Sequence, residues 1–208
     1  MKFGKPLFAS IALVASFGAQ ALTGTTVAGP GSSFLTLSAP GVCGICSLSG
    51  SVTADINGGS IVQDDQPFAD IPKGAVPGGL FLSAGPSTTD PSTVSFTSGP
   101  VDSINFLWGS PDLYNALTVV TTLGSFAFDV MNLGFSETQG NQAFSQYVQF
   151  TAAAGESITG LIFSSSRDAF EATNFSVTTP VPEPETYVLM LAGIGAVGFM
   201  SRRRRRQA

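Results

Sequence analysis

The sequence predicts an all-β protein, a two-sheet antiparallel β-sandwich of jelly-roll type. Short runs of β-branched and aromatic residues recur along the chain, each bounded by Gly, Pro, Ser, Asn or Asp. Outside the two ends, no stretch has the apolar repeat of about 3.6 residues that marks an amphipathic helix. Many short strands at this spacing favour two packed sheets over a fold in which strands alternate with helices.

Ten strands are expected, and side-chain alternation supports several of them. Successive residues of a strand point to opposite faces, so Ile104, Phe106 and Trp108 would share one face. Between residues 57 and 91 Gly, Pro and Asp accumulate, and we expect long loops there around one short strand. The ten expected ranges are 33–37, 51–56, 79–83, 93–98, 103–108, 116–123, 125–130, 144–151, 157–164 and 170–177.

The first 21 residues have the three parts of a secretory signal peptide. Two lysines lie near the start, residues 7–17 are mostly apolar, and Ala19 and Ala21 form the small-x-small pattern of a signal-peptidase site. We therefore expect export by the Sec machinery and removal of residues 1–21. The remaining body, residues 22–178, is the expected sandwich domain.

The last 30 residues, 179–208, contain three features in a fixed order. A Pro182-Glu183-Pro184 triplet is followed by an apolar run over residues 187–200, which we expect to be a transmembrane helix. Its 14 residues would span only about 21 Å, less than the roughly 30 Å of a hydrocarbon core. The basic residues that follow would stay on the cytoplasmic side; they are Arg202, Arg203, Arg204, Arg205 and Arg206.

This tail resembles the PEP-CTERM sorting tail, in which a Pro-Glu-Pro triplet precedes a short hydrophobic helix and a basic end. The resemblance implies that an exosortase, an enzyme of the inner membrane, recognises Pro182, Glu183 and Pro184 and removes the tail. It also implies a Gram-negative source that makes exopolysaccharide, with transient anchoring in the inner membrane before release to the cell surface or beyond. The alternative is an ordinary tail anchor in which the triplet is a stiff spacer.

The body is strongly acidic once the two ends are set aside. Of nine basic residues, two lie in the signal segment and five in the tail, which leaves Lys73 and Arg167. Of fourteen acidic residues, only Glu183 and Glu185 lie in the tail, so the body carries twelve and a formal charge near −10. Such a surface repels phosphate backbones, and nucleic acid is therefore excluded as an expected partner.

The chain contains no histidine, which removes Ser-His-Asp and Cys-His chemistry from consideration. We expect no enzyme and no metal site. The remaining catalytic option is a carboxylate-only glycan hydrolase, which needs two acids about 5 to 9.5 Å apart. No motif selects such a pair among the candidates, which are Asp102, Asp112, Asp129, Glu137, Glu156 and Glu171.

The two cysteines, Cys43 and Cys46, lie between Gly-rich and Pro-rich turns. Export would place them in an oxidising compartment, so we favour a local structural disulfide over a redox or metal site. Because the closed loop is short, its loss should cost towards the low end of the usual range of about 2 to 4 kcal/mol.

The most distinctive segment of the body is residues 106–115, which joins two expected strands through a Ser-Pro-Asp turn. It brings Trp108, Asp112, Tyr114 and Asn115 together, and sugar rings can stack on aromatic faces while polar side chains bond their hydroxyls. We take these four residues as the candidate glycan contact. The alternative is that Trp108 fills the core and the polar residues shape the turn.

The block at residues 106–115 is also similar to one found in exosortase-dependent surface proteins of unassigned activity. The segment 170–177 is similar to the last strand of many jelly rolls, and in carbohydrate-binding relatives the residue at the position of Asn174 can hold structural Ca²⁺. A second possible calcium loop, Asp64, Asp65 and Asp70, lacks the EF-hand pattern.

These observations lead us to expect a structural protein of the surface or matrix that associates with extracellular polysaccharide in a biofilm and needs no cofactor. The alternatives are a carbohydrate-binding module, with Ca²⁺ in one version, and the carboxylate-only hydrolase.

Overall fold

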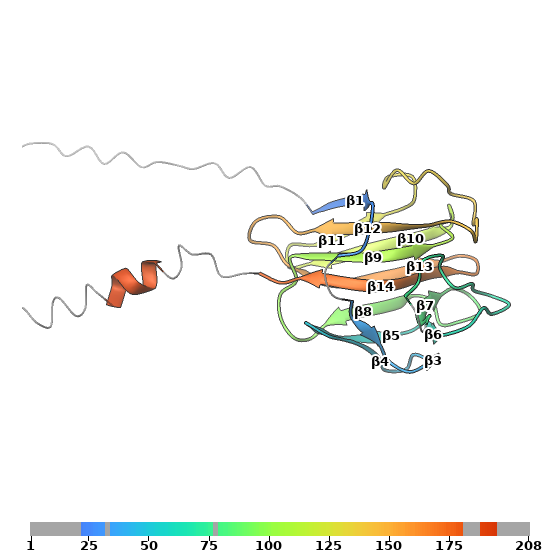
Figure 1. Cartoon of the computed structure of the whole chain (residues 1–208), viewed down its shortest axis with the longest axis horizontal. Helices are drawn as coiled ribbons and strands as arrows, with labels where there is room; N and C mark the ends of the chain where they lie inside the picture. Colours follow the sequence, from blue (N-terminus) through green and yellow to red (C-terminus); the bar gives the residue numbers. More distant parts are fainter. Residues whose placement is uncertain (1–21, 32–33, 77–78, 181–187, 195–208) are drawn as a thin grey trace, which may run out of the picture.

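The computed structural model describes residues 22–31, 34–76, 79–180 and 188–194, and within them fourteen strands form two antiparallel sheets (Figure 1). The two-sheet antiparallel sandwich predicted from the sequence is confirmed. The predicted signal peptide with Ala19 and Ala21, the Pro182-Glu183-Pro184 triplet and the arginines Arg202 to Arg206 lie outside the described residues.

The first sheet has seven strands in the order β1-β12-β9-β14-β7-β6-β3, and neighbouring strands are antiparallel throughout. Its central strand, β14, is the longest, with nine residues, and β9 and β12 follow with seven each. The bounds are β1 Thr23–Val27, β12 Ser145–Thr151, β9 Ser103–Gly109, β14 Phe170–Thr178, β7 Phe81–Ala84, β6 Ser60–Val62 and β3 Gly41–Val42.

The second sheet also has seven strands, in the order β11-β10-β13-β8-β5-β4-β2. Their bounds are β11 Ser125–Phe128, β10 Asn115–Thr121, β13 Ile158–Ser165, β8 Ser92–Phe96, β5 Thr53–Asn57, β4 Cys46–Ser49 and β2 Thr36–Leu37. From β7 onward the chain alternates between the sheets except at the β10–β11 hairpin, which places β7, β14, β9 and β12 in the first sheet and β8, β13, β10 and β11 in the second. This is the strand order of an eight-stranded jelly roll, to which β1–β6 add the outer strands.

All ten strands expected from the sequence are present with boundaries shifted by a few residues, but β1, β3, β4 and β6 were missed. β3 and β6 are only two and three residues long, and β4 has the sequence Cys-Ser-Leu-Ser, which is too polar to signal a strand. The expectation of one short strand between residues 57 and 91 was therefore wrong, because that stretch contains β6 and β7. Pairing with neighbouring strands compensates for weak local propensity here.

Aromatic rings fill the space between the two sheets. Trp108 stacks on Phe170 with ring centroids 4.0 Å apart, and Phe106 meets Phe163 edge to face at 5.5 Å. Ile104, Phe106 and Trp108 are all fully buried, as their alternation predicts. Offset and edge-to-face contacts of this kind add to the free energy gained by removing apolar area from water.

The segment between β6 and β7 crosses the outer face of the first sheet, over β9 and β14. Pro72 packs so closely on Gly109 that a Cβ at that glycine would lie 2.8 Å from the proline ring. Thr173 Oγ1 donates a hydrogen bond to the carbonyl of Leu80, at 2.7 Å. Consequently β14 is buried on both faces, apart from its last residue.

The register of the first sheet shows which residues lie at each of the two ends of the sandwich. At one end Thr23, Thr151, Ser103 and Thr178 are paired in a row, so the chain enters β1 and leaves β14 at the same end (Figure 1). At the other end Gly109 pairs with Glu171. Seven residues of extended strand, about 23 Å, separate Glu171 from Thr178.

A short helix covers residues 188–194, inside the range 187–200 in which a transmembrane helix is predicted. Its side chains are exposed. Within the described residues, no helix combines the length and apolar character needed to cross a membrane. The transmembrane helix therefore stays a prediction from the sequence.

Candidate functional site

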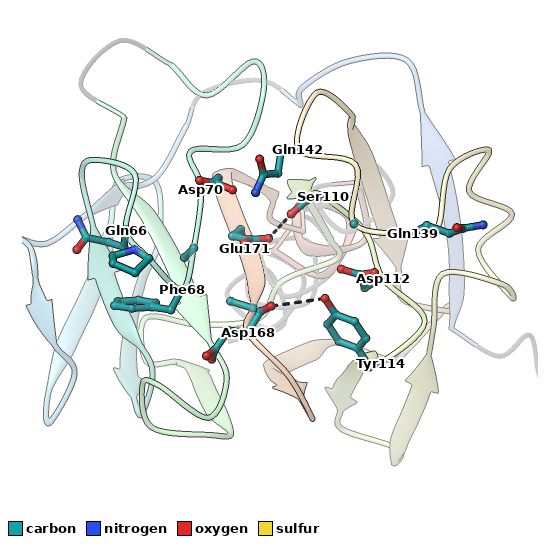
Figure 2. Close-up of a pocket in the computed structure, with 14 residues that line it drawn as sticks. Gln66, Phe68, Asp70, Ser110, Asp112, Tyr114, Gln139, Gln142, Asp168 and Glu171 are labelled. Atoms are coloured by element: carbon teal, nitrogen blue, oxygen red, sulfur yellow. Dashed lines mark hydrogen bonds between the residues drawn. The ribbon is translucent and has the colours of Figure 1, made fainter.

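A polar cleft of about 270 Å³ opens at the end of the sandwich opposite Thr178. Four chain segments line it: residues 66–70 from the loop after β6, residues 110–114 between β9 and β10, residues 139–142 before β12, and residues 168–171 at the start of β14. Figure 2 shows the carboxyl, amide and phenol groups of these segments around the opening. Chain reversals that connect the two sheets thus build the site.

Glu171 lies at the base of the cleft and is 3% exposed. The hydroxyl of Ser110 donates a hydrogen bond to its Oε2 at 2.7 Å (Figure 2), and the backbone of Asp70 supplies a second hydrogen bond to the carboxyl group. Burial raises the pKa of Glu171 from 4.5 to about 8, while the bond from Ser110 opposes the rise. Glu171 therefore carries a proton at neutral pH and can donate as well as accept hydrogen bonds.

Asp112 lies in the same cleft and is 8% exposed. The phenol of Tyr114 is the one side-chain hydrogen-bond partner of its carboxylate among the described residues. The carboxylate also packs against Gly140, where a Cβ would lie 2.5 Å from Oδ2. Burial first, and then the neighbouring Asp112, raise the pKa of Tyr114 well above its usual value of 10.0. The phenol is thus a permanent donor, and Asp112 is a buried acceptor with unused capacity.

The other two acids of the cleft are held differently. Asp168 accepts hydrogen bonds from the backbone N–H and the hydroxyl of Ser87, at 2.9 and 2.5 Å, so its carboxylate fixes the turn before β8. Asp70 remains free of such bonds among the described residues, and burial, with Asp65 nearby, raises its pKa. Asp70, Asp112 and Glu171 are therefore the acids available to a bound molecule.

The four residues predicted as a glycan contact have different environments. Trp108 is fully buried between Phe106, Phe135 and Phe170, so the prediction that its ring meets a sugar is wrong. Asn115 is 1% exposed and accepts a hydrogen bond from Ser165, so it too cannot reach a ligand. Period-2 alternation turns the large ring of Trp108 inward with Ile104 and Phe106.

Asp112 and Tyr114 do line the cleft, and their role as glycan contacts stays a prediction. Of the six acids considered for hydrolysis, the cleft contains Asp112 and Glu171. Glu156, another of the six, instead accepts hydrogen bonds from Thr121 and from the N–H of Ala153 and so shapes a loop.

Two of the suggested calcium positions, Asn174 and Asp65, make structural hydrogen bonds. The Asn174 side chain accepts a hydrogen bond from the N–H of Val76 and donates to the carbonyl of Gly74 and to Tyr147. Asp65 accepts a bond from the N–H of Ile71. In the described part of the chain, no group of three or more His, Cys, Asp or Glu side chains is placed to hold a metal ion.

Cys43 and Cys46 form a disulfide, which closes a short loop between β3 and β4. The pairing predicted from the sequence is confirmed. This loop lies outside the residues that line the cleft.

Several cleft residues were not identified from the sequence, namely Gln66, Phe68, Ser110, Gln139, Gln142 and Asp168. They come from four segments up to about a hundred residues apart, and none stands in a recognisable motif. Only the Ser-Pro-Asp turn at residues 110–112 could have indicated the place. Binding residues lie on loops more often than on strands or helices.

Fold and site together define a β-sandwich domain with a polar cleft at one end and a C-terminal tail leaving the other. Residues 180–206 of that tail match the PEP-CTERM protein-sorting motif, as the triplet, apolar run and arginines predict. The chain thus carries a sorting tail, which implies an exosortase as the processing partner, export, and anchoring at a membrane before release to the surface. No curated protein and no solved structure matches the chain.

Proposed function

We propose that the sandwich is a matrix component that associates with extracellular polysaccharide through its polar cleft once the tail has been processed. The observation that carries the proposal is the cleft itself, in which the buried Asp112 has unused hydrogen-bonding capacity. Sugar hydroxyls are the donors most abundant in the layer to which a sorted surface protein is delivered.

The position of the cleft supports this role. Thr178, where β14 ends, leads directly into the sorting tail, whereas Glu171 lies at the opposite end of the strand. A domain held by its C-terminus therefore presents the cleft away from the point of attachment. The acidic body would also resist adsorption to anionic lipid headgroups.

The sorting step is tested by the intact mass and location of the protein in the producing cell. We expect the wild type to lose the segment after the triplet and to fractionate with the polysaccharide layer. Glu183→Ala should keep the full tail and remain with the membrane, while Glu185→Ala, just outside the triplet, serves as the matched control. An identical C-terminus with and without the sorting enzyme would mean that the tail is only an anchor.

Association with polysaccharide is tested by co-sedimentation of the processed protein with the producer's own polymer. We expect the protein to sediment with the polymer, and we expect Asp112→Asn to reduce the bound fraction. Recovery of all protein in the supernatant would contradict the proposal.

A carboxylate-only glycan hydrolase is the second candidate, and one observation favours it. Glu171 keeps a proton near neutral pH and lies in the same cleft as Asp112, and a carboxyl group with a raised pKa beside a second acid can serve as the general acid of such a pair. We nevertheless propose binding without cleavage, since no motif selects these acids as a catalytic pair. Release of reducing ends from the producer's polymer, abolished by Glu171→Gln, would establish the hydrolase instead.

A further inference from the structure

We infer that the cleft selects saccharides that present hydroxyl or ammonium donors and carry no negative charge, with amino sugars preferred over neutral ones. This inference rests on the proposed association with polysaccharide and adds the chemical class of the sugar. It excludes polymers built from uronic acids as ligands of the cleft.

Asp112 supplies the first argument. A buried carboxylate with too few donors is costly, and native proteins normally satisfy such groups with protein, water or ligand. Asp112 is 8% exposed and lines the cleft, and among the described residues the phenol of Tyr114 is the one side-chain hydrogen-bond partner of its carboxylate. A ligand hydroxyl or ammonium group can supply a further donor, whereas a second carboxylate cannot.

The charges around Asp112 supply the second argument. Asp70 and Asp168 line the same cleft, and among the described residues no ion pair neutralises either of them. Glu171 carries a proton at neutral pH and adds no charge. Arg167, an exposed cation of the body, lies over the ring of Tyr114 at 5.6 Å from its centroid. The cleft therefore has an excess of negative charge, which attracts an ammonium group and repels a carboxylate.

Glu171 and Tyr114 make the site suitable for a sugar rather than for a bare cation. The protonated Glu171 can donate one hydrogen bond and accept another. The hydroxyl of Tyr114 donates to the carbonyl of Asp168 at 3.5 Å, and its oxygen can still accept a hydrogen bond (Figure 2). Together the two groups match the mixed donor and acceptor character of a sugar hydroxyl. Phe68 and Tyr114 lie on opposite sides of the opening in Figure 2, and both are half-buried. Their partly exposed rings offer apolar surface to the C–H face of a sugar.

The size of the cleft limits the length of chain that it holds. Its volume of about 270 Å³ is slightly below the range of about 300 to 1,000 Å³ typical of sites for drug-sized ligands. A short stretch or an end of a saccharide chain is therefore the unit recognised.

The test measures binding of three oligosaccharides of equal length to the processed protein: glucosamine, N-acetylglucosamine and galacturonic acid oligomers. We expect the cationic oligomer to bind at least about tenfold more tightly than the neutral one, which corresponds to about 1.4 kcal/mol, and the anionic oligomer to show no binding. Asp112→Asn keeps the shape of the side chain but removes its charge, and it should abolish the preference for glucosamine. Asp55→Asn, on the exposed side of β5, is the matched control and should leave all three affinities unchanged.

Three outcomes distinguish this inference from the proposed function. Equal or tighter binding of the galacturonic acid oligomer would overturn the inference. Sedimentation with the producer's polymer that Asp112→Asn leaves unaltered would also overturn it, while the association itself would stand. Absence of binding to every oligomer and to the producer's polymer would overturn both.

Discussion

Phe170 and Glu171 are neighbours in β14, yet they belong to the two most different regions of the molecule. Phe170 is 1% exposed and stacks on Trp108 in the aromatic interior, where described side chains form a continuous apolar cluster. Glu171 is 3% exposed on the opposite face, where it contacts Ser110 and lines the polar cleft. Nearly equal burial therefore has opposite chemical consequences.

The difference shows how a sandwich buries both faces of a central strand. The second sheet covers the inner face of β14 with apolar side chains, as the alternation of the strand requires. The loop that contains Asp70 and Pro72 covers part of the outer face, and its polar groups leave the cleft open. The interior stabilises the fold, whereas the cleft holds polar groups at a cost in stability.

The largest expected effect on stability comes from removing the indole ring of Trp108 from the interior. Trp108→Ala leaves a cavity between Phe106, Phe135 and Phe170, and we expect it to lower the free energy of unfolding by about 3 to 5 kcal/mol. Urea denaturation of the exported protein measures the loss. Trp108→Phe is the control, since it keeps an aromatic ring and removes an indole N–H that has no partner among the described residues.

Fluorescence of the wild type tests whether Trp108 lies in the interior, because Trp108 is the only tryptophan of the chain. Its emission should be blue-shifted and should not respond to saccharide. Quenching by a bound sugar would mean that the ring belongs to the cleft rather than to the interior.

The second effect is a dependence of stability on pH that comes from Glu171. The folded chain keeps this proton up to about pH 8, whereas the ordinary pKa of 4.5 applies after unfolding. Between these values the folded state binds more protons, so the free energy of unfolding falls as pH rises, by at most about 1.4 kcal/mol per pH unit. The stabilising contribution is complete below about pH 4.5 and lost above about pH 8.

Glu171→Gln should flatten this dependence, as urea denaturation across that range will show. The chain has no histidine, which removes the usual competing titration. Glu137→Gln is the control at a partly exposed acid and should retain the wild-type slope. A slope that persists in Glu171→Gln would mean that Glu171 is charged in the folded protein.

The aromatic interior could be predicted from the sequence, and most of the cleft could not. Alternation places Ile104, Phe106 and Trp108 on one face wherever the strand lies in the sheet, so local pattern was sufficient. The same pattern also places Trp108 on the inner face. The Ser-Pro-Asp turn beside it suggested a glycan contact, and for Trp108 that prediction was wrong. When a short segment contains both the end of a strand and a turn, its composition alone does not decide whether an aromatic ring lies in the interior or at a ligand site.

The cleft depends on contacts between segments that only the complete topology brings together. Asp70 and Gln142 are 72 positions apart, and Glu171 reaches Ser110 because β14 pairs with β9. The two short strands β3 and β6 could not be predicted for the same reason, since each forms by pairing with a partner strand and not by its own propensity. The disulfide and the sorting tail are the opposite case, because each is encoded in consecutive residues.

The third effect concerns the disulfide, which lies outside both regions. Replacing both cysteines, Cys43→Ala with Cys46→Ala, should lower the free energy of unfolding by about 2 kcal/mol, since the closed loop is short. Ile45 within the loop is 89% exposed and adds little packing. Thermal unfolding with and without a thiol reductant measures the effect. Saccharide binding should remain unchanged, and its loss would connect the loop to the cleft.

The smallest expected effect on stability comes from two glycine substitutions, which distinguish a change in the cleft from a change in the rest of the fold. Gly140 and Gly134 both have positive φ, 66° and 71°, and both lie between β11 and β12. Replacing either by alanine forces a side chain into the left-handed region and should cost about 1 kcal/mol. Only at Gly140 does the new methyl group meet Asp112, because nothing lies within 4 Å of a Cβ at Gly134.

We therefore expect Gly140→Ala to lose at least as much stability as Gly134→Ala in urea denaturation and to be the only one of the two that weakens binding. The methyl group at residue 140 displaces the Asp112 carboxylate and narrows the cleft, so glucosamine oligomers should bind at least about tenfold more weakly. Gly134→Ala should bind as the wild type does. If both variants weaken binding equally, backbone strain in the loop is the cause, and Asp112 does not contact the sugar.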